Sequence, residues 1–229
     1  MKRTALIVWA LCASGAASAQ ESDLSVSVGL RAWRTDWTTF SYYAPDGVNN
    51  EALTQISAKE KVAALPGISV RYGRFLATLG ALASTRFTFD DGSTAKRSEW
   101  DASVGYSILP GLTATLGYKR VSQSDGTNVY RPAGPVLGLG ASAPIGEGLS
   151  LYGSVGLGRL KTPAGDAIDF KANYTLTEVG LSYALNADHP RWTLTGGYRM
   201  QVLRSKEAFG QQDGRDTTQG FTLGMLVTF

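Results

Sequence analysis

The sequence predicts an all-β chain that folds as a closed, antiparallel, up-and-down transmembrane β-barrel of about ten strands, with eight strands as the alternative. Three observations predict this fold. Apolar and polar residues alternate with a period of two along most of the chain, which is a strand pattern. Long and short connections alternate between these segments along the chain. The first 19 residues have the form of an export signal.

The export signal comes first in the chain. Lys2 and Arg3 precede an apolar run from Ala5 to Ala13, and Ala17-Ser18-Ala19 follows it. The run is too short for a membrane helix, which needs ~20 residues, but it suits a signal peptide that ends at a small-x-small cleavage site. We therefore expect residues 1–19 to be removed and residues 20–229 to form a single barrel domain.

Composition excludes several classes of protein. The single cysteine, Cys12, lies inside the signal. The exported chain therefore has no thiol for a disulfide framework, a nucleophile or a metal ligand. Removal of the signal also leaves 20 bases against 19 acids, so nucleic acid is not an expected partner.

The first five predicted strands alternate apolar residues with Gly, Ser, Thr and charged residues. Their apolar faces are Leu24, Val26, Val28, Leu30 and Ala32; Val62, Ala64, Ile68, Val70 and Tyr72; Phe75, Ala77, Leu79, Ala81 and Ala83; Trp100, Ala102, Val104, Tyr106 and Ile108; and Leu112, Ala114, Leu116 and Tyr118. Each set is short enough for one strand and is bounded by turn residues.

Five further strands follow with the same texture. Their apolar faces are Leu137, Leu139, Ala141 and Ala143; Leu149, Leu151, Val155 and Leu157; Val179, Leu181, Tyr183 and Leu185; Trp192, Leu194, Tyr198 and Met200; and Phe221, Leu223, Met225, Val227 and Phe229. The even total of ten predicts that both ends of the barrel chain lie on the same side of the membrane.

Loop lengths set the orientation. The short turns are Gly73-Arg74, Pro110-Gly111, 145–148 and 186–190, whereas the long connections are 38–54, 90–96, 123–133, 161–171 and 205–216. Barrels of the bacterial outer membrane have long loops outside and short turns in the periplasm. A soluble lipocalin-like barrel would alternate as well, with its apolar face inward. The polar face here consists largely of small residues with few charges, and aromatic residues lie at the strand ends. Both features favour a membrane barrel.

The last strand adds a family resemblance. The segment from Thr222 to Phe229 has a polar residue, Gly224 two positions later, hydrophobic residues at alternating positions including Val227, and a terminal aromatic residue. It resembles the C-terminal assembly signal of bacterial outer-membrane proteins, and the chain as a whole resembles the small barrels of the OmpX, OmpW and opacity-protein groups. The resemblance implies recognition by the barrel assembly machinery through strand addition.

Charged residues of inward parity need partners inside the lumen. Register estimated from the turn centres predicts three ion pairs, which are Arg86 with Glu99, Asp101 with Lys119, and Glu178 with Arg199. Four inward cations remain without a predicted acid: Arg31, Lys59, Lys61 and Arg71. Because a narrow barrel is filled by its own side chains, we interpret the pairs first as a plug and second as a constriction that favours anions.

Outward parity gives another pattern at the loop ends of the upward strands. The residues are Arg34, Arg120, Arg159 and Arg204, which stand 8 to 12 residues beyond the periplasmic start of their strands. This spacing is about one hydrocarbon thickness. Two interpretations stay open: contact with lipopolysaccharide phosphates, or ordinary rim charge that snorkels into water.

Aromatic residues gather at the first loop. Trp33 and Trp37 have inward parity at the barrel mouth, and Phe40, Tyr42 and Tyr43 follow in a long connection. They would either contact an external partner or fold inward as a lid.

No enzyme signature emerges. Outer-membrane enzymes need a histidine with acids or with a serine, and the one histidine, His189, falls in a short turn on the predicted periplasmic side. No calcium-loop spacing is present among the loop acids. We expect no cofactor and no metal.

The sequence therefore favours a monomeric, non-enzymatic barrel of the Gram-negative outer membrane, with a salt-bridged lumen and loops for surface interaction or envelope stabilisation. Its expected partners are outer-membrane lipids, lipopolysaccharide, the assembly machinery and an extracellular ligand. The alternative is a narrow, porin-like channel for small anions or amphiphilic solutes.

Overall fold

The computed structural model describes residues 24–43, 52–166, 169–188, 190–205 and 213–229. The predicted signal peptide lies outside the described residues. No helix among the described residues is long and apolar enough to cross a membrane.

The described residues form eleven strands. In chain order these are β1 (Leu24–Tyr43), β2 (Ala52–Tyr72), β3 (Phe75–Thr88), β4 (Thr94–Leu109), β5 (Leu112–Ser124), β6 (Val129–Tyr130), β7 (Ala133–Gly146), β8 (Leu149–Lys161), β9 (Lys171–Ala184), β10 (Arg191–Ser205) and β11 (Asp213–Thr228). β6 is a two-residue extension that pairs only with the end of β5. The other ten form the wall, as the sequence predicts.

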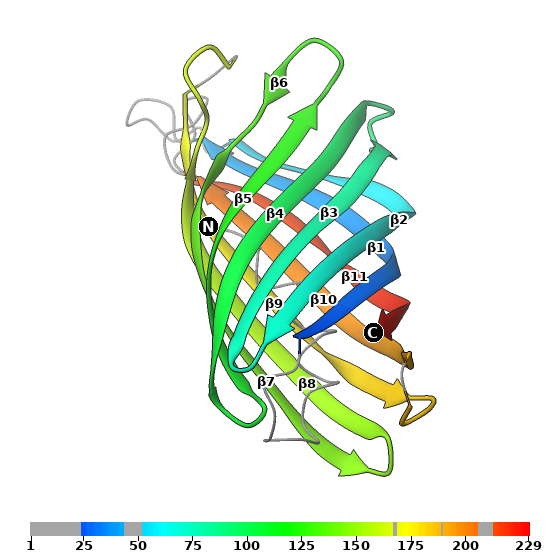
Figure 1. Cartoon of the computed structure of the whole chain (residues 1–229). Coiled ribbons are helices and arrows are strands. Elements are labelled where there is room, and N and C mark those ends of the chain that lie inside the picture. Colours follow the sequence, from blue (N-terminus) through cyan, green and yellow to red (C-terminus); the bar gives the residue numbers. More distant parts are fainter. Residues whose placement is uncertain (1–23, 44–51, 167–168, 189, 206–212) are drawn as a thin grey trace.

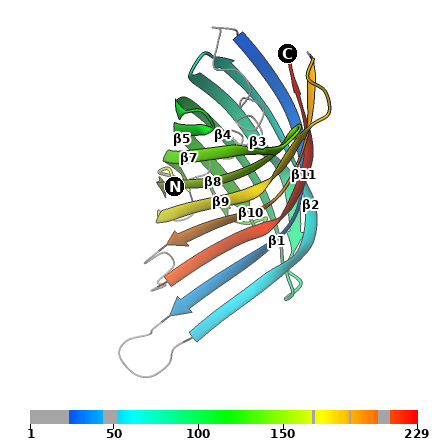
Figure 2. The ribbon, with the colours of Figure 1, turned by 90° about the horizontal axis from the view of Figure 1, so that it is seen from below.

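The wall closes on itself (Figure 1). Each strand pairs antiparallel with its neighbour in the chain, and β1 pairs with β11 from Ser27–Thr228 to Tyr42–Asp213. Seen from below, β7, β8, β9, β10, β11, β1 and β2 follow one another in this order (Figure 2). The fold is therefore the closed up-and-down barrel that the alternation predicts.

The two ends of the barrel differ. At one end β2 and β3 are joined by Gly73 and Arg74, β4 and β5 by Pro110 and Gly111, and β7 and β8 by Glu147 and Gly148. Gly73, Gly111 and Gly148 have positive φ values of 55°, 75° and 68°, which glycine adopts without steric cost. The other end carries the longer connections, as expected. The first connection is shorter than predicted because β1 continues through Phe40 and Tyr42 to Tyr43.

The apolar faces point outward. Leu79, Val104, Leu116 and Leu181 are 53%, 61%, 54% and 46% exposed, whereas Glu99 and Arg199 are 4% and 1% exposed. A soluble barrel would have the opposite arrangement, since its apolar face lines the interior. An apolar outer face with a polar interior is the arrangement of a membrane barrel.

Two irregularities reverse the inward parity partway along a strand. Between the pairs Thr35–Lys61 and Trp37–Ala58, β2 carries one residue more than β1. Between Leu82–Glu99 and Thr85–Arg97, β3 likewise carries one residue more than β4. Because one inserted residue moves every later side chain to the other face, strict alternation fails beyond these points.

The ladder between β2 and β3 is interrupted. It runs from Gly67–Gly80 to Tyr72–Phe75, next to the short turn, and resumes only at the isolated bridge between Ala58 and Phe89. The strands diverge in this region (Figure 1). Behind the interruption, on the lumen side, lies a buried apolar cluster made by Trp33, Ala63, Leu65 and Leu82. The cluster fills the interior at the level where the wall lacks backbone pairing.

Candidate functional site

A layer of charged side chains crosses the barrel interior. Its members come from five strands and are each at most 5% exposed: Arg31, Arg97, Glu99, Asp101, Lys119, Glu178 and Arg199. Charges this deeply buried require pairing, because desolvation of a lone ion costs on the order of several kcal/mol. The structure pairs six of them in two groups, and the seventh, Arg199, lies over the Trp33 ring.

Glu99 is the centre of the first group. Its Oε1 accepts from Arg97 Nε at 2.8 Å, and its Oε2 lies 2.7 Å from Lys119 Nζ. Lys119 also donates to Asp101 Oδ1 at 2.8 Å. The register places Asp101 opposite Lys119, so this ion pair forms where the turn centre predicts it.

The second group joins β1 to β9. Arg31 Nη1 lies 2.5 Å from Glu178 Oε1, and Tyr152 donates its hydroxyl to the same oxygen at 3.2 Å. A Cβ at Gly224, which is paired with Arg31, would lie 2.3 Å from Arg31 Cγ. Gly224 therefore leaves the space through which the arginine side chain enters the lumen.

The prediction for Glu178 is correct in register and wrong in partner. Arg199 lies opposite Glu178 on β10, but the ion pair of Glu178 is with Arg31. The Arg199 guanidinium instead lies 4.3 Å from the centroid of the Trp33 ring. Arg31 consequently has an inward acid, contrary to its assignment as an excess cation.

Gln201 connects the two sides of the lumen. It lies on β10, which is five strands from β4 in either direction around the ring. In one orientation of its amide, Gln201 accepts from Arg97 Nη2 at 3.3 Å. In the other, it donates to Glu99 Oε1 at 3.1 Å and accepts from Arg199 Nε at 2.9 Å. Both orientations span the barrel, so side chains fill its full width at this level.

The two inward tryptophans belong to this filling. Trp33 and Trp37 are 0% and 4% exposed. Trp37 packs edge-on against Phe87 and Phe89, at ring centroid separations of 5.5 Å and 5.2 Å, and Arg97 lies 5.3 Å from its centroid. Of the two interpretations of these residues, the inward one describes where they lie, and they present no surface to an external partner.

Three predicted lumen cations lie elsewhere. Arg86 is opposite Lys96 rather than Glu99, and its side chain is exposed, because the extra residue in β3 turns it outward. Lys59 and Lys61 are exposed at the irregularity in β2. The proposed pair of Arg86 with Glu99 and the assignment of both lysines to the lumen are therefore wrong.

Arg71 keeps its inward parity near the short-turn end. It is half-buried, and its Nη1 donates to Ser107 Oγ at 3.1 Å.

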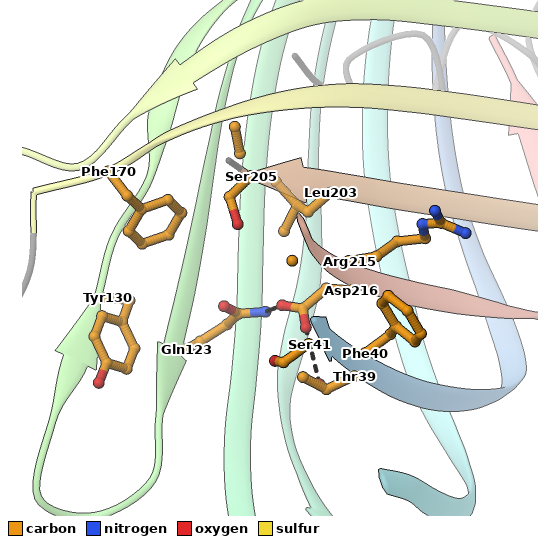
Figure 3. A pocket seen from close by; sticks show the side chains of 12 residues that line it. Thr39, Phe40, Ser41, Gln123, Tyr130, Phe170, Leu203, Ser205, Arg215 and Asp216 are labelled. Carbon is orange, nitrogen blue, oxygen red and sulfur yellow. Dashed lines mark hydrogen bonds between the residues drawn. The ribbon is translucent and has the colours of Figure 1, made fainter. Parts of the chain in front are cut away.

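A pocket opens at the long-loop end, above the charged layer (Figure 3). Asp216 on β11 forms its floor: Oδ1 accepts from Thr39 Oγ1 at 2.8 Å, and Oδ2 accepts from Gln123 Nε2 at 2.9 Å. β5 and β11 are also five strands apart in both directions, so the bond from Gln123 spans the mouth. Tyr130 and Phe170 stand across the pocket from Asp216 (Figure 3).

An ion pair holds the rim of this pocket. Arg131, between β6 and β7, binds Asp166 of the β8–β9 connection through Nε at 2.8 Å and through its backbone N–H at 2.6 Å. The Asp166 side chain is fully buried. Two connections that are distant in sequence are therefore joined beside Tyr130 and Phe170, whose rings are 6.4 Å apart.

Comparison with known proteins identifies the fold. No protein-family profile and no curated protein matches the chain. Among solved structures, the outer-membrane protease OmpT from Escherichia coli matches with a TM-score of 0.55 and 13% identity, covering 93% of this chain and 100% of that chain. AlkL, an outer-membrane protein solved in DMPC bilayers, matches with a TM-score of 0.48 and 13% identity, covering 93% of each chain. OprG from Pseudomonas aeruginosa matches with a TM-score of 0.39 and 11% identity, covering 92% of this chain and 97% of that chain.

The fold is that of a small outer-membrane β-barrel. At 13% identity the match to OmpT establishes the fold alone, and it carries no residue roles with it.

Aromatic pairs lie on the outer face of the barrel. Phe75 and Tyr106 are 5.3 Å apart next to the short turns, and Tyr198 and Phe221 are 5.1 Å apart farther up the wall. Aromatic side chains at two levels of the outer face are typical of the interfacial girdles of an outer-membrane barrel.

The four predicted outward arginines lie on the outer face of the barrel, toward the long-loop end. Arg34 is exposed and ion-paired with Glu60. Arg159 is exposed and donates to Asn173 Oδ1 at 3.3 Å, and Arg204 is exposed beside the same Asn173. Arg120 lines an outer groove with Trp100, Tyr118, Arg131 and Lys161.

The remaining aromatic residues of the first connection belong to β1. The Phe40 ring lies 5.5 Å from the Arg215 guanidinium. Tyr42 is half-buried. Tyr43 ends the strand, and its side chain, like the loop at 44–51 and His189, lies outside the described residues.

Several lumen residues escape a reading of the sequence. Arg97 has the parity of Glu99 and Asp101, and Gln201 has the parity of Arg199, so a longer β4 and attention to amides would have found both. Asp216 and Gln123 meet only through closure of the barrel, and no local pattern predicts that contact.

Proposed function

We propose that the protein is a non-enzymatic barrel of the Gram-negative outer membrane, closed to solutes, that acts at its extracellular end and through its contacts with lipid. The observation that supports a closed lumen most directly is the pair of side-chain bonds that span the ring. One joins Gln201 to the β4 side, and the other joins Gln123 to Asp216.

The energetics favour a permanent plug. Removal of one partner from a buried ion pair costs about 3–5 kcal/mol, because the other charge stays buried and uncompensated. Opening a pore would break several such contacts around Glu99 and Asp101 at once. The interior layer holds four cations and three acids among the described residues, so a pore opened there would favour anions.

Planar-bilayer recording of the refolded protein tests the plug. We expect no single-channel steps from the wild type. The double variant Arg97→Ala/Gln201→Ala removes both sides of the central contact and is expected to give measurable steps. Arg86→Ala, which removes an outward arginine on the neighbouring strand, is the matched control and is expected to stay silent. Regular unitary steps from the wild type would contradict the closed lumen.

The outer surface supports a role in the envelope. The arginines Arg34, Arg120, Arg159 and Arg204 lie on the outer face toward the extracellular end, and guanidinium groups bind phosphates in bidentate fashion. We propose that they contact lipopolysaccharide at its phosphate level. Replacement of all four by Gln is expected to lower the amount of lipopolysaccharide that co-purifies. Arg74→Gln at a periplasmic turn is the control, and retention equal to wild type in the fourfold variant would count against the contact.

We propose a non-enzymatic protein because the sequence offers few catalytic groups. The chain has one histidine, His189, which falls in the sequence between β9 and β10, in a connection that we propose to be periplasmic. The described residues that line the mouth offer carboxylate, amide and hydroxyl groups but no histidine, the base that the outer-membrane enzymes considered above require.

Two further parts of the proposal concern assembly. The terminal strand β11 completes the wall by pairing with both β1 and β10. Its motif of Thr222, Gly224, Val227 and Phe229 is proposed to be the segment that the barrel assembly machinery binds, since an unpaired strand edge is a template for strand addition. The barrel is proposed to act as a monomer.

One observation favours a second candidate, a route for amphiphilic solutes. The wall lacks ladder pairing between β2 and β3 above Gly67–Gly80, and only the cluster around Trp33 fills the interior behind it. An amphiphile that leaves the lumen through the wall between β2 and β3 would have to displace the indole ring of Trp33. Trp33→Ala is then expected to raise the uptake of a fluorescent amphiphile into proteoliposomes, whereas Trp192→Ala on the outer face is not. Equal uptake by both variants would remove the candidate.

A further inference from the structure

The pocket at the extracellular mouth combines a carboxylate with an apolar and aromatic wall. The carboxylate belongs to Asp216. The apolar and aromatic lining includes Leu203, Phe170 and Tyr130 (Figure 3), together with Ala172. Leu203 and Ala172 are at most 5% exposed and are part of a buried cluster that holds the wall in place.

Asp216 makes two neutral hydrogen bonds and no ion pair among the described residues. Its donors are Thr39 Oγ1 and Gln123 Nε2. A carboxylate has about four lone-pair sites, so these two bonds leave about half of the accepting capacity of Asp216, which lines the pocket, unused. The nearest lining cation, Arg215, points away from Asp216 and toward Phe40 (Figure 3). Among the described residues, hydroxyl and amide dipoles therefore compensate the negative charge.

The size of the pocket limits the ligand. Its volume is about 180 Å³, and an engineered apolar cavity of ~150 Å³ accommodates one benzene ring. The space thus suits a single ring with a short polar arm. Arg131 and Asp166 join the two connections that carry Tyr130 and Phe170, and restraint of an aromatic wall in advance lowers the entropic cost of binding.

We propose that this pocket binds a small organic cation, a primary ammonium that carries one apolar or aromatic group. The ammonium donates to Asp216 and the apolar group packs against Phe170, Tyr130 and Leu203. Aromatic faces add to the attraction because their quadrupole favours a nearby cation. The proposal goes beyond the closed lumen and does not depend on it, since binding at the mouth needs no passage through the barrel.

Benzylammonium is the probe, and benzyl alcohol is its neutral counterpart of similar shape. Binding to the full barrel in zwitterionic detergent is followed by NMR titration of the Leu203 and Ala172 amides. Asp216→Asn keeps the shape of the side chain and removes its charge. It is expected to weaken benzylammonium about tenfold or more, the usual contribution of a charge-assisted hydrogen bond, and to leave benzyl alcohol unchanged.

Two other variants complete the test. Asp90→Asn removes an exposed acid at the β3–β4 turn, at the same end of the barrel, and is expected to bind like the wild type. Ser205→Phe fills the pocket without a change of charge and is expected to abolish saturable binding of both probes. The proposal is overturned if benzylammonium does not saturate, if Asp216→Asn binds it as the wild type does, or if Asp90→Asn weakens it equally. None of these outcomes bears on channel conductance, so they leave the closed lumen to its own test.

Discussion

Glycine has a definite task at the residue scale inside this lumen. Tyr152 lies across Gly180 and Gly197, which are paired on β9 and β10. A Cβ at Gly180 would lie 2.4 Å from the carbonyl oxygen of Gly196 and 2.6 Å from Tyr152 Cζ. The two glycines therefore leave the space in which the Tyr152 side chain lies and reaches Glu178. Their place in the sequence reflects the size of Tyr152, which is paired with Gly180 on the neighbouring strand β8.

Gly180→Ala is accordingly expected to destabilise the barrel by about 1–3 kcal/mol, the usual cost of overpacking a filled interior. Urea unfolding in detergent micelles measures the change. Gly153→Ala is the matched control, since a Cβ there has only one neighbour, at 3.9 Å. Equal stability of the two variants would show that the space around Tyr152 is not tightly packed.

Asp125 provides a pH-dependent contact at the β5–β6 turn. The backbone N–H groups of Asn128 and Thr127 donate to its Oδ1 at 2.7 Å and 2.9 Å and lower the pKa of the carboxyl below its ordinary value. A lowered pKa means that this contact stabilises the turn above the unfolded pKa of ~3.9 and is lost as the pH falls through the folded value. The Asn128 amide shift is expected to titrate below pH ~4 in the wild type and to stay constant in Asp125→Asn. A midpoint above that pH would contradict this account.

At the scale of elements, the irregularities in β2 and β3 decide where side chains point. Each inserts one residue on one side of a ladder. Phe87 and Phe89 thereby turn inward to meet Trp37, and Arg86 turns outward. Both irregular strands border the interruption of the wall, so the departure from regular pairing is concentrated in one place.

Backbone amides that face this interruption are expected to exchange with deuterium about tenfold faster, or more, than ladder amides of the same strands, because no neighbouring carbonyl protects them. The residues concerned lie in 59–66 and 81–88, and the reference amides lie in 67–72. The uninterrupted ladder between β8 and β9 serves as a second reference. Uniform protection across β2 and β3 would mean that the wall is paired throughout in solution.

The sequence predicts elements better than contacts. Strand number, inward and outward faces, and the position of Lys119 opposite Asp101 all follow from alternation and turn centres. Arg86 and Lys59 could not be predicted because no residue announces a bulge in a strand of otherwise regular alternation. The partner of Glu178 depends on side-chain length across the lumen, since Arg31 reaches it from three strands away. The mouth pocket depends on closure and has no local signature.

For the whole molecule, the unequal ends predict an orientation. The exported chain is expected to have no cysteine, so single introduced cysteines report position without a background. On intact cells, a membrane-impermeant maleimide is expected to label Thr127→Cys at a long connection and to leave Arg74→Cys at a short turn unlabelled. Arg74→Cys should react after the outer membrane is opened. The reverse labelling pattern would show that the barrel has the opposite orientation, with the mouth pocket in the periplasm.

The seam between β1 and β11 joins residues that are 171 to 201 positions apart in the chain. Loop-closure entropy makes such distant pairing slow to form. Until β11 pairs with β1, the backbone groups on that edge of β1 are unpaired, and Arg31 and Trp33 lack their neighbours on β11. We therefore expect the folding chain to pass through a stage that is vulnerable to proteolysis and aggregation, which ends only when the sixteen residues of β11 pair with β1.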